Sequence, residues 1–271
     1  MRISIITATY NSEKTLLDTL DAHMKVSIIT VTYNSEKTIK DTLDSVAVQT
    51  YNNIEYIIVD GASSDATLHI INNSSASVAK CISERDKGIY DALNKGVHLA
   101  TGDIIGFIHS DDILARPDII ETIVIEFQKT KADIVYGDLV FVDRSDVNNI
   151  VRYWHSGSFR KSKISLGWAP PHPSFYMKRS LYKEDGFFDL TFKIAADYDQ
   201  MIRVLKRERI KVIYLPQVFV KMRLGGESTK LDNTVASTKE IISIMKKHHI
   251  NWYIAIVTRK FSKLTQLFRK S

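Results

Sequence analysis

Two adjacent aspartates, Asp111 and Asp112, follow an apolar run in the segment IIGFIHSDDIL, residues 104–114. Two carboxylates about 4 Å apart repel by roughly 4 kcal/mol at an effective dielectric near 20, and a divalent cation removes that cost. Mg²⁺ prefers one or two carboxylates and takes its other ligands from water and substrate phosphates. The pair therefore predicts a metal site that carries a phosphorylated ligand. The alternative interpretation is that Asp112 caps the segment before the next helix.

A third aspartate, Asp60, also comes directly after an apolar run, YIIV at residues 56–59. In open parallel sheets, ligands bind at the carboxyl ends of the strands, near the point where strand order reverses. We therefore expect Asp60 and the Asp111–Asp112 pair at one edge of such a sheet. The sequence contains neither the GxGxxG fingerprint nor a GxxxxGK[ST] loop, which argues against Rossmann dehydrogenases and P-loop enzymes.

The first half of the chain has the pattern of a sheet that could position these residues. Continuous apolar strands that alternate with helices indicate a parallel sheet covered on both faces. The predicted strands are 25–31, 54–59, 78–83 and 104–108, and helices are predicted over 34–49, shortly after 60–67, and over 90–100. Cys81, within the third strand, is expected in the core.

The second half is less regular. A helix is predicted from Pro117 to about Lys129, and residues 132–143 with 149–154 are typical of a β-hairpin or a switch to antiparallel strands. After a polar loop, a helix over 195–208, a strand pair over 211–224 and two closing helices are expected. The predicted fold class is α/β: a mostly parallel central sheet flanked by helices, a smaller antiparallel part and C-terminal helices.

The N-terminus carries a repeat. Residues 1–23 and 24–46 are identical at 16 of 23 positions, but only the second copy runs on into a full helix and the next strand. A solenoid would need at least three units to share a core. The first copy is an extra edge element, a swapped element or a disordered leader, and the sequence leaves these alternatives open.

Composition and charge narrow the classes of protein. The single cysteine excludes an intramolecular disulfide and a thiolate zinc site, which favours a reducing compartment. No 18 apolar residues run together and the start lacks a signal-peptide run, so we expect no spanning helix and a cytoplasmic protein. The net charge is +6, but residues 241–271 alone carry seven Lys and Arg and no acid. The nearly neutral remainder does not suggest a nucleic-acid partner.

The basic tail has an apolar face. Tyr253, Val257, Phe261, Leu264 and Phe268 recur at helical spacing among lysines and arginines. One interpretation is a helix over 251–271 that lies on the inner face of the cell membrane. The other is a helix packed on the domain with its solvated side basic.

Three longer stretches of the sequence resemble the family-2 glycosyltransferases, which have the GT-A fold. These stretches are residues 26–67, 83–112 and 187–204. The resemblance covers about residues 25–225. It implies an inverting sugar transfer from a nucleotide-sugar donor, usually a UDP-sugar, with Mg²⁺ or Mn²⁺, to a saccharide or lipid-linked acceptor. It also implies a domain over 24–228, with a nucleotide-binding half at 24–115 and an acceptor-binding half at 116–228, and separate C-terminal helices at 229–271.

Matching positions carry the family's roles onto this sequence. On the donor side, the resemblance implies a nucleotide site whose members are Thr32, Tyr33, Asn34, Asp60, Asp86, Asn94 and Asp111, with Asp60 on the base. Asp112, with Asp111, would hold the metal on the diphosphate.

On the acceptor side, Asp197 matches the catalytic base, and Asp199 and Arg203 are its neighbours on the same helix. His172 lies where the acceptor site is usually built. An acceptor hydroxyl has a high pKa, so a carboxylate within reach must take its proton during attack. Positions two apart point roughly 200° apart on a helix, so only one of Asp197 and Asp199 can readily face the site.

The sequence departs from the family pattern at three places, one of which is the metal motif: residues 110–112 are Ser-Asp-Asp instead of Asp-x-Asp, a variant that the family tolerates. The repeat makes Thr9, Tyr10 and Asn11 rivals for the nucleotide contact, although the second copy is preferred. Ala196 stands where many members carry a second acid, which lets Asp199 compete with Asp197 as the base. Two other functions stay open: a sugar nucleotidyltransferase, and a non-catalytic nucleotide- or carbohydrate-binding protein.

Overall fold

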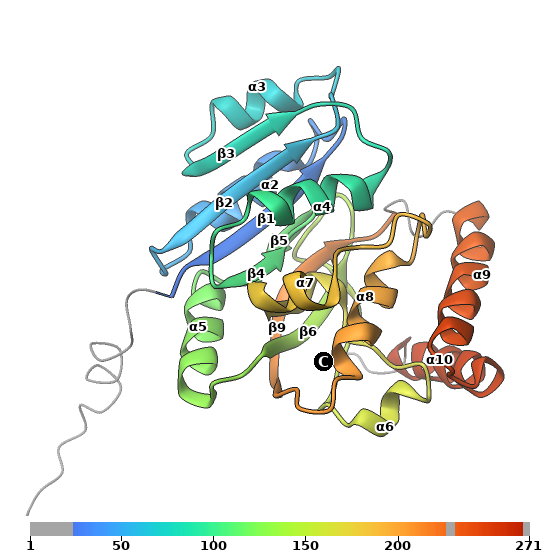
Figure 1. The fold of residues 1–271 in the computed structure, drawn as a ribbon. Helices are drawn as coiled ribbons and strands as arrows, with labels where there is room; N and C mark the ends of the chain where they lie inside the picture. Colours follow the sequence, from blue (N-terminus) through green and yellow to red (C-terminus); the bar gives the residue numbers. More distant parts are fainter. Residues whose placement is uncertain (1–23, 226–230, 268–271) are drawn as a thin grey trace, which may run out of the picture.

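The computed structural model describes residues 24–225 and 231–267, where nine strands form one sheet with helices on both faces (Figure 1). The strand order is β3-β2-β1-β4-β8-β6-β9-β5, with β7 paired to β6. Residues 1–23, including Thr9, Tyr10 and Asn11, lie outside the described part. The strands are β1 Val26–Thr32, β2 Ile54–Asp60, β3 Val78–Ser83, β4 Ile104–Phe107, β5 Asp112–Leu114, β6 Ile134–Val142, β7 Ile150–Trp154, β8 Phe175–Lys178 and β9 Val212–Arg223.

The parallel half of the sheet has β1 near its centre. Strands β2 and β4 pair with β1 in parallel, and β3 pairs in parallel with β2. Every residue of β1 is buried, as expected for a continuous apolar strand with helices on both sides. The expected parallel sheet is confirmed. One expectation is wrong: Cys81 is exposed, because β3 is the edge strand and its residues alternate in burial.

The other half of the sheet is mixed. The predicted hairpin is confirmed as antiparallel β6 and β7, while β8 runs antiparallel to both β4 and β6. The strand pair expected over 211–224 is instead one long strand, β9, parallel to β6. The register of β9 shifts between Tyr214 and Val218. Pro216 lacks an N–H for the ladder, and here the strand accommodates it with this irregularity instead of turning back.

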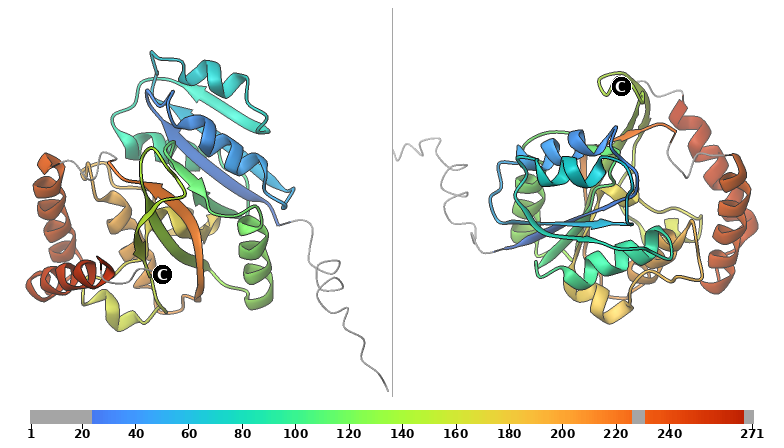
Figure 2. Two further views of the ribbon diagram at one scale, coloured as in Figure 1. Left: turned by 180° about the vertical axis from the view of Figure 1, so that it is seen from behind. Right: turned by 90° about the horizontal axis from the view of Figure 1, so that it is seen from above.

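Helices form a layer on each face of the sheet (Figures 1 and 2). On one face, Ile39, Leu43 and Ile119 pack in a core with Val26 and Ile28 of β1. On the other, Leu93 and Ile202 pack with Ile29 of the same strand. The first layer contains α2 Ile39–Ala47, α3 Thr67–Asn72 and α5 Ile119–Thr130; the second contains α4 Ile89–Leu99, α7 Arg179–Asp185 and α8 Ala196–Leu205, with α6 Lys161–Ile164 and the 3₁₀ turn η1 His172–Ser174 in the connections.

Two C-terminal helices, α9 Leu231–Lys247 and α10 Trp252–Leu267, lie beside α8 at one end of the molecule (Figure 2). Ile244, Met245 and Ala255 are fully buried in the core that α8 shares. Gly167 approaches so closely that a Cβ there would lie 2.9 Å from Ala255 Cβ. The first part of the tail therefore packs on the domain. The side chains of Phe261 and Leu264, and all of Phe268, lie outside the described residues.

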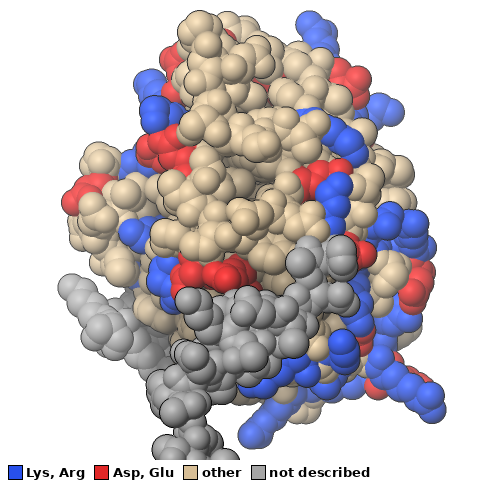
Figure 3. All heavy atoms as spheres, turned by 90° about the vertical axis from the view of Figure 1, so that its left-hand side faces the viewer, with Lys and Arg blue, Asp and Glu red and all other residues tan. Residues whose placement is uncertain are grey.

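The described residues include no helix long and apolar enough to cross a bilayer. On the face drawn in Figure 3, acidic and basic side chains are interspersed.

Candidate active site

The ends of β1 and β2 form the first part of the candidate site. Thr32 and Asp60, the last residues of these strands, are direct neighbours in the ladder. Asp60 is fully buried, and its carboxylate accepts hydrogen bonds from the Ser63 N–H (2.9 Å), the Ser63 hydroxyl and the Ser83 hydroxyl (2.6 Å). Asp60 thus fixes the turn that follows β2, and its oxygens already have donors.

The loop after β1 is fastened to the same turn. Asn34 has a left-handed backbone (φ 47°); its N–H donates to Ser63 Oγ (2.8 Å), and its Oδ1 accepts from the Ser64 N–H (2.9 Å). Tyr33 is 64% exposed. The hydroxyl of Thr32 is buried and finds no partner in the described structure. The loop therefore presents an open aromatic ring and an unused hydroxyl.

Asp86 closes this corner of the site. A Cβ on Gly61 would lie 3.1 Å from Asp86 Oδ2 and 3.4 Å from the Tyr33 ring. Lys95 of α4 donates to Asp86 Oδ1 at 2.5 Å and pairs with Glu84 at 2.8 Å. Asp86 and the Tyr33 ring therefore both lie close to Gly61 in the turn after β2.

The two adjacent aspartates have different surroundings. Asp112 begins β5 and is fully buried on the same face as Leu114, which packs against α2. Both of its carboxylate oxygens lack partners in the described structure. Burial raises the pKa of Asp112 well above its usual value, the charge of Asp111 adds to this, and Arg223 opposes it. Asp111 is only half-buried, so it is the more accessible carboxylate.

A serine pair joins this carboxylate loop to the loop after β1. Ser35 Oγ and Ser110 Oγ lie 2.9 Å apart, and Ser110 directly precedes Asp111. The strands before the two loops, β1 and β4, are also neighbours in the sheet. The nucleotide-side residues and Asp111 consequently meet at the carboxyl ends of adjacent parallel strands, where ligands of such sheets bind.

Asp197 lies in the first turn of α8 and is half-buried. The Tyr90 hydroxyl is 2.9 Å from Asp197 Oδ1 and 2.7 Å from the carbonyl oxygen of Ile194, so it holds the carboxylate against the loop before α8. No donor to Oδ2 occurs among the described residues. No pattern in the sequence indicates this contact between Tyr90 and Asp197.

Two histidines, the partly buried His109 and the buried His172, feel the charge of Asp197. His172 stacks on Phe107 (centroids 4.8 Å apart), its ring is 6.2 Å from that of His109, and its Nε2 has no described partner. Burial lowers the pKa of His172 to about 4, although the charge of Asp197 opposes this. Burial also lowers the pKa of His109, while Asp111 and Asp197 oppose it. His109 was not predicted as a site residue, and its place two before Asp111 at a strand end was the available signal.

Three residues expected in the site have other contacts. The Asn94 amide donates to the Phe188 carbonyl and accepts from the Phe188 N–H, both at 2.9 Å, so it anchors this loop. Asp199 is fully buried and points away from Asp197 to His248 (2.8 Å). Arg203 binds Asp199 (3.0 Å) and two backbone carbonyls. The structure thus gives these three residues anchoring roles.

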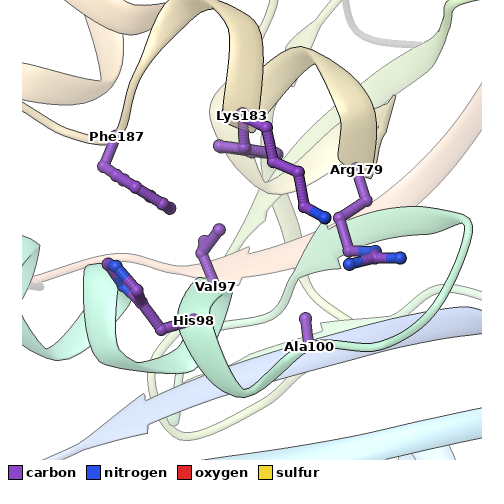
Figure 4. A pocket seen from close by; sticks show the side chains of 7 residues that line it. Val97, His98, Ala100, Arg179, Lys183 and Phe187 are labelled. Atoms are coloured by element: carbon purple, nitrogen blue, oxygen red, sulfur yellow. The ribbon is translucent and has the colours of Figure 1, made fainter.

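A separate pocket of about 110 Å³ lies between α4 and α7 (Figure 4). Its lining includes His98, Phe187, Arg179 and Lys183. The His98 and Phe187 rings stack with centroids 4.1 Å apart. None of the candidate site residues lines this pocket, so we do not assign it to the same site.

The side chains around Asp111 determine whether a metal ion could bind there. The described residues include no group of three or more His, Cys, Asp and Glu side chains arranged to hold an ion. Mg²⁺ and Mn²⁺ with nucleotides need less, because phosphates and water complete their coordination. The accessible Asp111 and the unpartnered oxygens of Asp112 beside it fit this type of partial site.

Comparison with known proteins places this geometry in context. The sequence profile described as "Glycosyl transferase family 2" matches residues 27–200. The PGL/p-HBAD biosynthesis glycosyltransferase of Mycobacterium bovis (strain BCG / Pasteur 1173P2) is 30% identical over 196 residues, which are 70% of this chain and 72% of that protein.

Solved structures share the fold. The mannosyltransferase PcManGT from Pyrobaculum calidifontis, in complex with GDP-Man and Mn²⁺, matches with a TM-score of 0.64 at 18% identity, over 96% of this chain and 82% of that one. S. aureus TarS 1–349 in complex with UDP-GlcNAc matches with a TM-score of 0.62 at 20% identity, over 82% of this chain. The chain spans 66% of TarS 1–349 and 39% of the longer TarS chain.

Proposed function

The chain belongs to glycosyltransferase family 2, and from this premise we propose that it is an inverting enzyme that moves a sugar from a UDP-sugar to an acceptor hydroxyl. The GT-A type fold and the enzyme class agree with this reading, and neither a nucleotidyltransferase nor a pure binding protein is supported. The observation that carries the proposal is the Ser35–Ser110 contact, which joins the loop that carries Tyr33 to the loop that carries Asp111, together with the charges of both Asp111 and Asp197 at His109.

We assign the base to Asp197. Its Oδ1 is held by Tyr90, which leaves Oδ2 to receive a proton. The acceptor hydroxyl would lose its proton to this carboxylate while its oxygen forms a bond to the anomeric carbon. The bond from that carbon to the phosphate oxygen breaks on the opposite side, and the electron pair leaves with UDP. Asp199 is paired with Lys247 and His248 at the end of α9, so it does not compete for this role.

On the donor side, we propose that Tyr33 and Asp86 contact the base and that Thr32 supplies a hydroxyl. Asn34 and Asp60 shape the loops that hold them. Asp111 would hold Mg²⁺ or Mn²⁺ on the diphosphate, with Asp112 behind it, and the ion would neutralise charge on the leaving group. A UDP-GlcNAc complex of TarS and a Mn²⁺ complex of PcManGT support this choice of ligands.

On the acceptor side, we propose residues 116–228 as the half that binds a saccharide or lipid-linked acceptor in bacterial glycan synthesis. His172 is its candidate contact, because its buried Nε2 faces no described partner and lies near Asp197. The similarity to a protein named for PGL/p-HBAD biosynthesis supports a role in glycan or glycolipid assembly.

We also propose peripheral contact with an anionic membrane surface through α10, at the cytoplasmic face. Trp252, Tyr253, Ile254 and Val257 are each 40% exposed or more. Lys246 lies over the Trp252 ring at 5.7 Å. Residues 241–271 contain no acid, so the charge of this part of the chain complements anionic lipid.

The experiment for the catalytic proposal compares Asp197→Asn with the control Asp118→Asn, at a partly exposed aspartate that pairs with Arg116 (2.8 Å). A screen of UDP-sugars for Mn²⁺-dependent thermal stabilisation first identifies the donor. Asp197→Asn should lower kcat by about 10²- to 10⁴-fold and keep the Kd for UDP with Mn²⁺ within about twofold, because it removes the base and leaves the donor site intact. Normal turnover by Asp197→Asn would refute the assignment.

Calorimetric titration of UDP with and without Mn²⁺ separates the two aspartates of the carboxylate loop. Asp111→Asn should weaken Mn²⁺-dependent UDP binding by about tenfold or more. Asp112→Asn should have a smaller effect, because Asp112 is fully buried whereas Asp111 is only half-buried. The opposite order would make Asp112 the direct ligand that the sequence suggested.

A further inference from the structure

The loop that carries the proposed base is held by a residue from the C-terminal helices. Glu240 of α9 accepts three backbone hydrogen bonds, from the N–H groups of Lys193 (2.8 Å), Ile194 (2.9 Å) and Ala195 (2.9 Å). These residues directly precede α8, and Asp197 follows two positions after Ala195. One carboxylate thus fixes the entire entry to the helix that positions Asp197.

The residues at the start of α8 do not themselves provide an acceptor for these N–H groups. Ala195, at the N-cap of α8, has no side-chain oxygen, and α8 has no side-chain cap. The first N–H groups of a helix need acceptors from elsewhere, and a negative charge near them is favourable. Glu240, 45 residues further along the chain, accepts the N–H of the N-cap residue Ala195 and places its negative charge beside the start of α8.

A second contact joins the same two helices. Asp199 of α8 pairs with Lys247 (3.0 Å) and with His248 (2.8 Å), which lie at the end of α9. Lys247 also pairs with Asp189 at 3.0 Å. The entry of α8 and its first turn are therefore both attached to α9, on either side of Asp197.

We propose that Glu240 is a positioning residue for sugar transfer, which sets where the Asp197 carboxylate lies relative to the acceptor. This inference rests on the proposed role of Asp197. The family match ends at residue 200, so Glu240 lies in a part of the chain beyond the match. A displacement of about 1 Å in a catalytic group can cost about 10²-fold in rate, so a loose entry loop would reduce turnover even in a folded enzyme.

The test uses the full chain with Glu240→Gln and Glu240→Ala. Gln keeps the shape and one acceptor oxygen, while Ala removes both. Lys239→Ala, at the neighbouring exposed position of α9, controls for substitution in that helix. Asp133→Asn controls for stability, because Asp133 also accepts a backbone N–H (Lys211, 3.0 Å) and pairs with a lysine (Lys178, 2.8 Å) elsewhere in the fold.

Three measurements are combined: kcat with the donor and acceptor that the wild-type chain turns over best, the Kd for UDP with Mn²⁺, and hydrogen exchange at amides 193–199. For Glu240→Ala we expect faster exchange at these amides, a fall in kcat of about 10- to 100-fold, and a UDP Kd within about twofold. Glu240→Gln should fall between Ala and wild type. The two controls should keep kcat within about twofold.

The outcomes separate this inference from the assignment of the base. If Glu240→Ala loses no more kcat than a control of equal stability, the positioning role is wrong, even where Asp197→Asn is inactive. If Asp197→Asn remains active, the assignment of the base itself fails. Equal loss of kcat and UDP affinity in Glu240→Ala would show a general structural effect and would also overturn the inference.

Discussion

Asp197 and Asp199 are two positions apart on one helix, yet their surroundings differ completely. Asp197 is half-buried and accepts one hydrogen bond from Tyr90, whereas Asp199 is fully buried among Arg203, Lys247 and His248. A general base needs an oxygen free to take a proton, and only Asp197 has one. The helical geometry inferred from the sequence implied that only one aspartate could face the site. Asp199 is the one that does not, because it is bound by Lys247 and His248 at the end of α9.

Tyr90→Phe tests the support of the base at this scale. The change removes the hydroxyl that holds Asp197 Oδ1, and we expect kcat to fall about tenfold with the donor KM unchanged, since hydrogen bonds to charged groups contribute about 1.5–3 kcal/mol. Tyr176→Phe is the matched control, because the buried Tyr176 hydroxyl has no described partner. Steady-state kinetics of both variants are the measurement, and equal rates would exclude a role for the Tyr90 hydroxyl.

At the scale of elements, the sequence allowed the parallel half to be predicted well, because continuous apolar runs such as β1 belong to strands covered on both faces. It failed where the outcome depended on long-range contacts. Cys81 is exposed because β3 is an edge strand, and β9 stays one strand because β6 supports it on both sides of Pro216. The two hydrogen bonds between the Asn94 amide and Phe188, 94 residues away, were likewise not predicted.

Removal of the Asp199 carboxylate tests the attachment of α8 to α9. Burial would raise its pKa, but hydrogen bonds from His248 and Lys247 and the charges of Arg203 and Lys247 lower the pKa of Asp199 to about 2. A carboxyl with a lowered folded-state pKa stabilises the protein above its unfolded value near 4 and loses this as the pH falls toward 2. Asp199→Asn should therefore destabilise by about 3 kcal/mol at pH 7.

Between pH 5 and pH 2, the free energy of unfolding of Asp199→Asn should fall by about 2 kcal/mol less than that of the wild type, since the titrating carboxyl is absent. Denaturant unfolding of both proteins across this range is the measurement. Parallel pH dependences would mean that the Asp199 carboxylate does not titrate as its contacts imply.

At the scale of the whole molecule, charge is divided between a nearly neutral body and a basic C-terminal segment. The α9–α10 pair buries Ile244, Met245 and Ala255 against the domain and leaves Tyr253 and Val257 exposed on α10. The two interpretations of the tail are therefore compatible: one face packs, and another is available to a membrane surface. Because α9 also carries Glu240, a surface that binds α10 lies one helix away from the loop that holds Asp197.

The double substitution Tyr253→Ser, Val257→Ser tests the membrane proposal without removing the packed residues. We expect at least fivefold weaker co-sedimentation with phosphatidylglycerol vesicles, because the exposed apolar face is lost and the lysines remain. Ile150→Ser with Val151→Ser, also exposed, should bind like wild type. Equal binding by both double variants would defeat the proposal.

The single thiol of the chain, Cys81, is a suitable attachment point for a spectroscopic probe near the proposed donor site. It stands beside Ile58 in the sheet ladder, two residues before Ser83, whose hydroxyl binds Asp60. Partial burial raises the pKa of the Cys81 thiol, and the charge of Asp60 adds to this, so alkylation by a maleimide dye should accelerate as the solution is made alkaline. A fluorophore attached there would report on nucleotide occupancy in an otherwise unaltered chain.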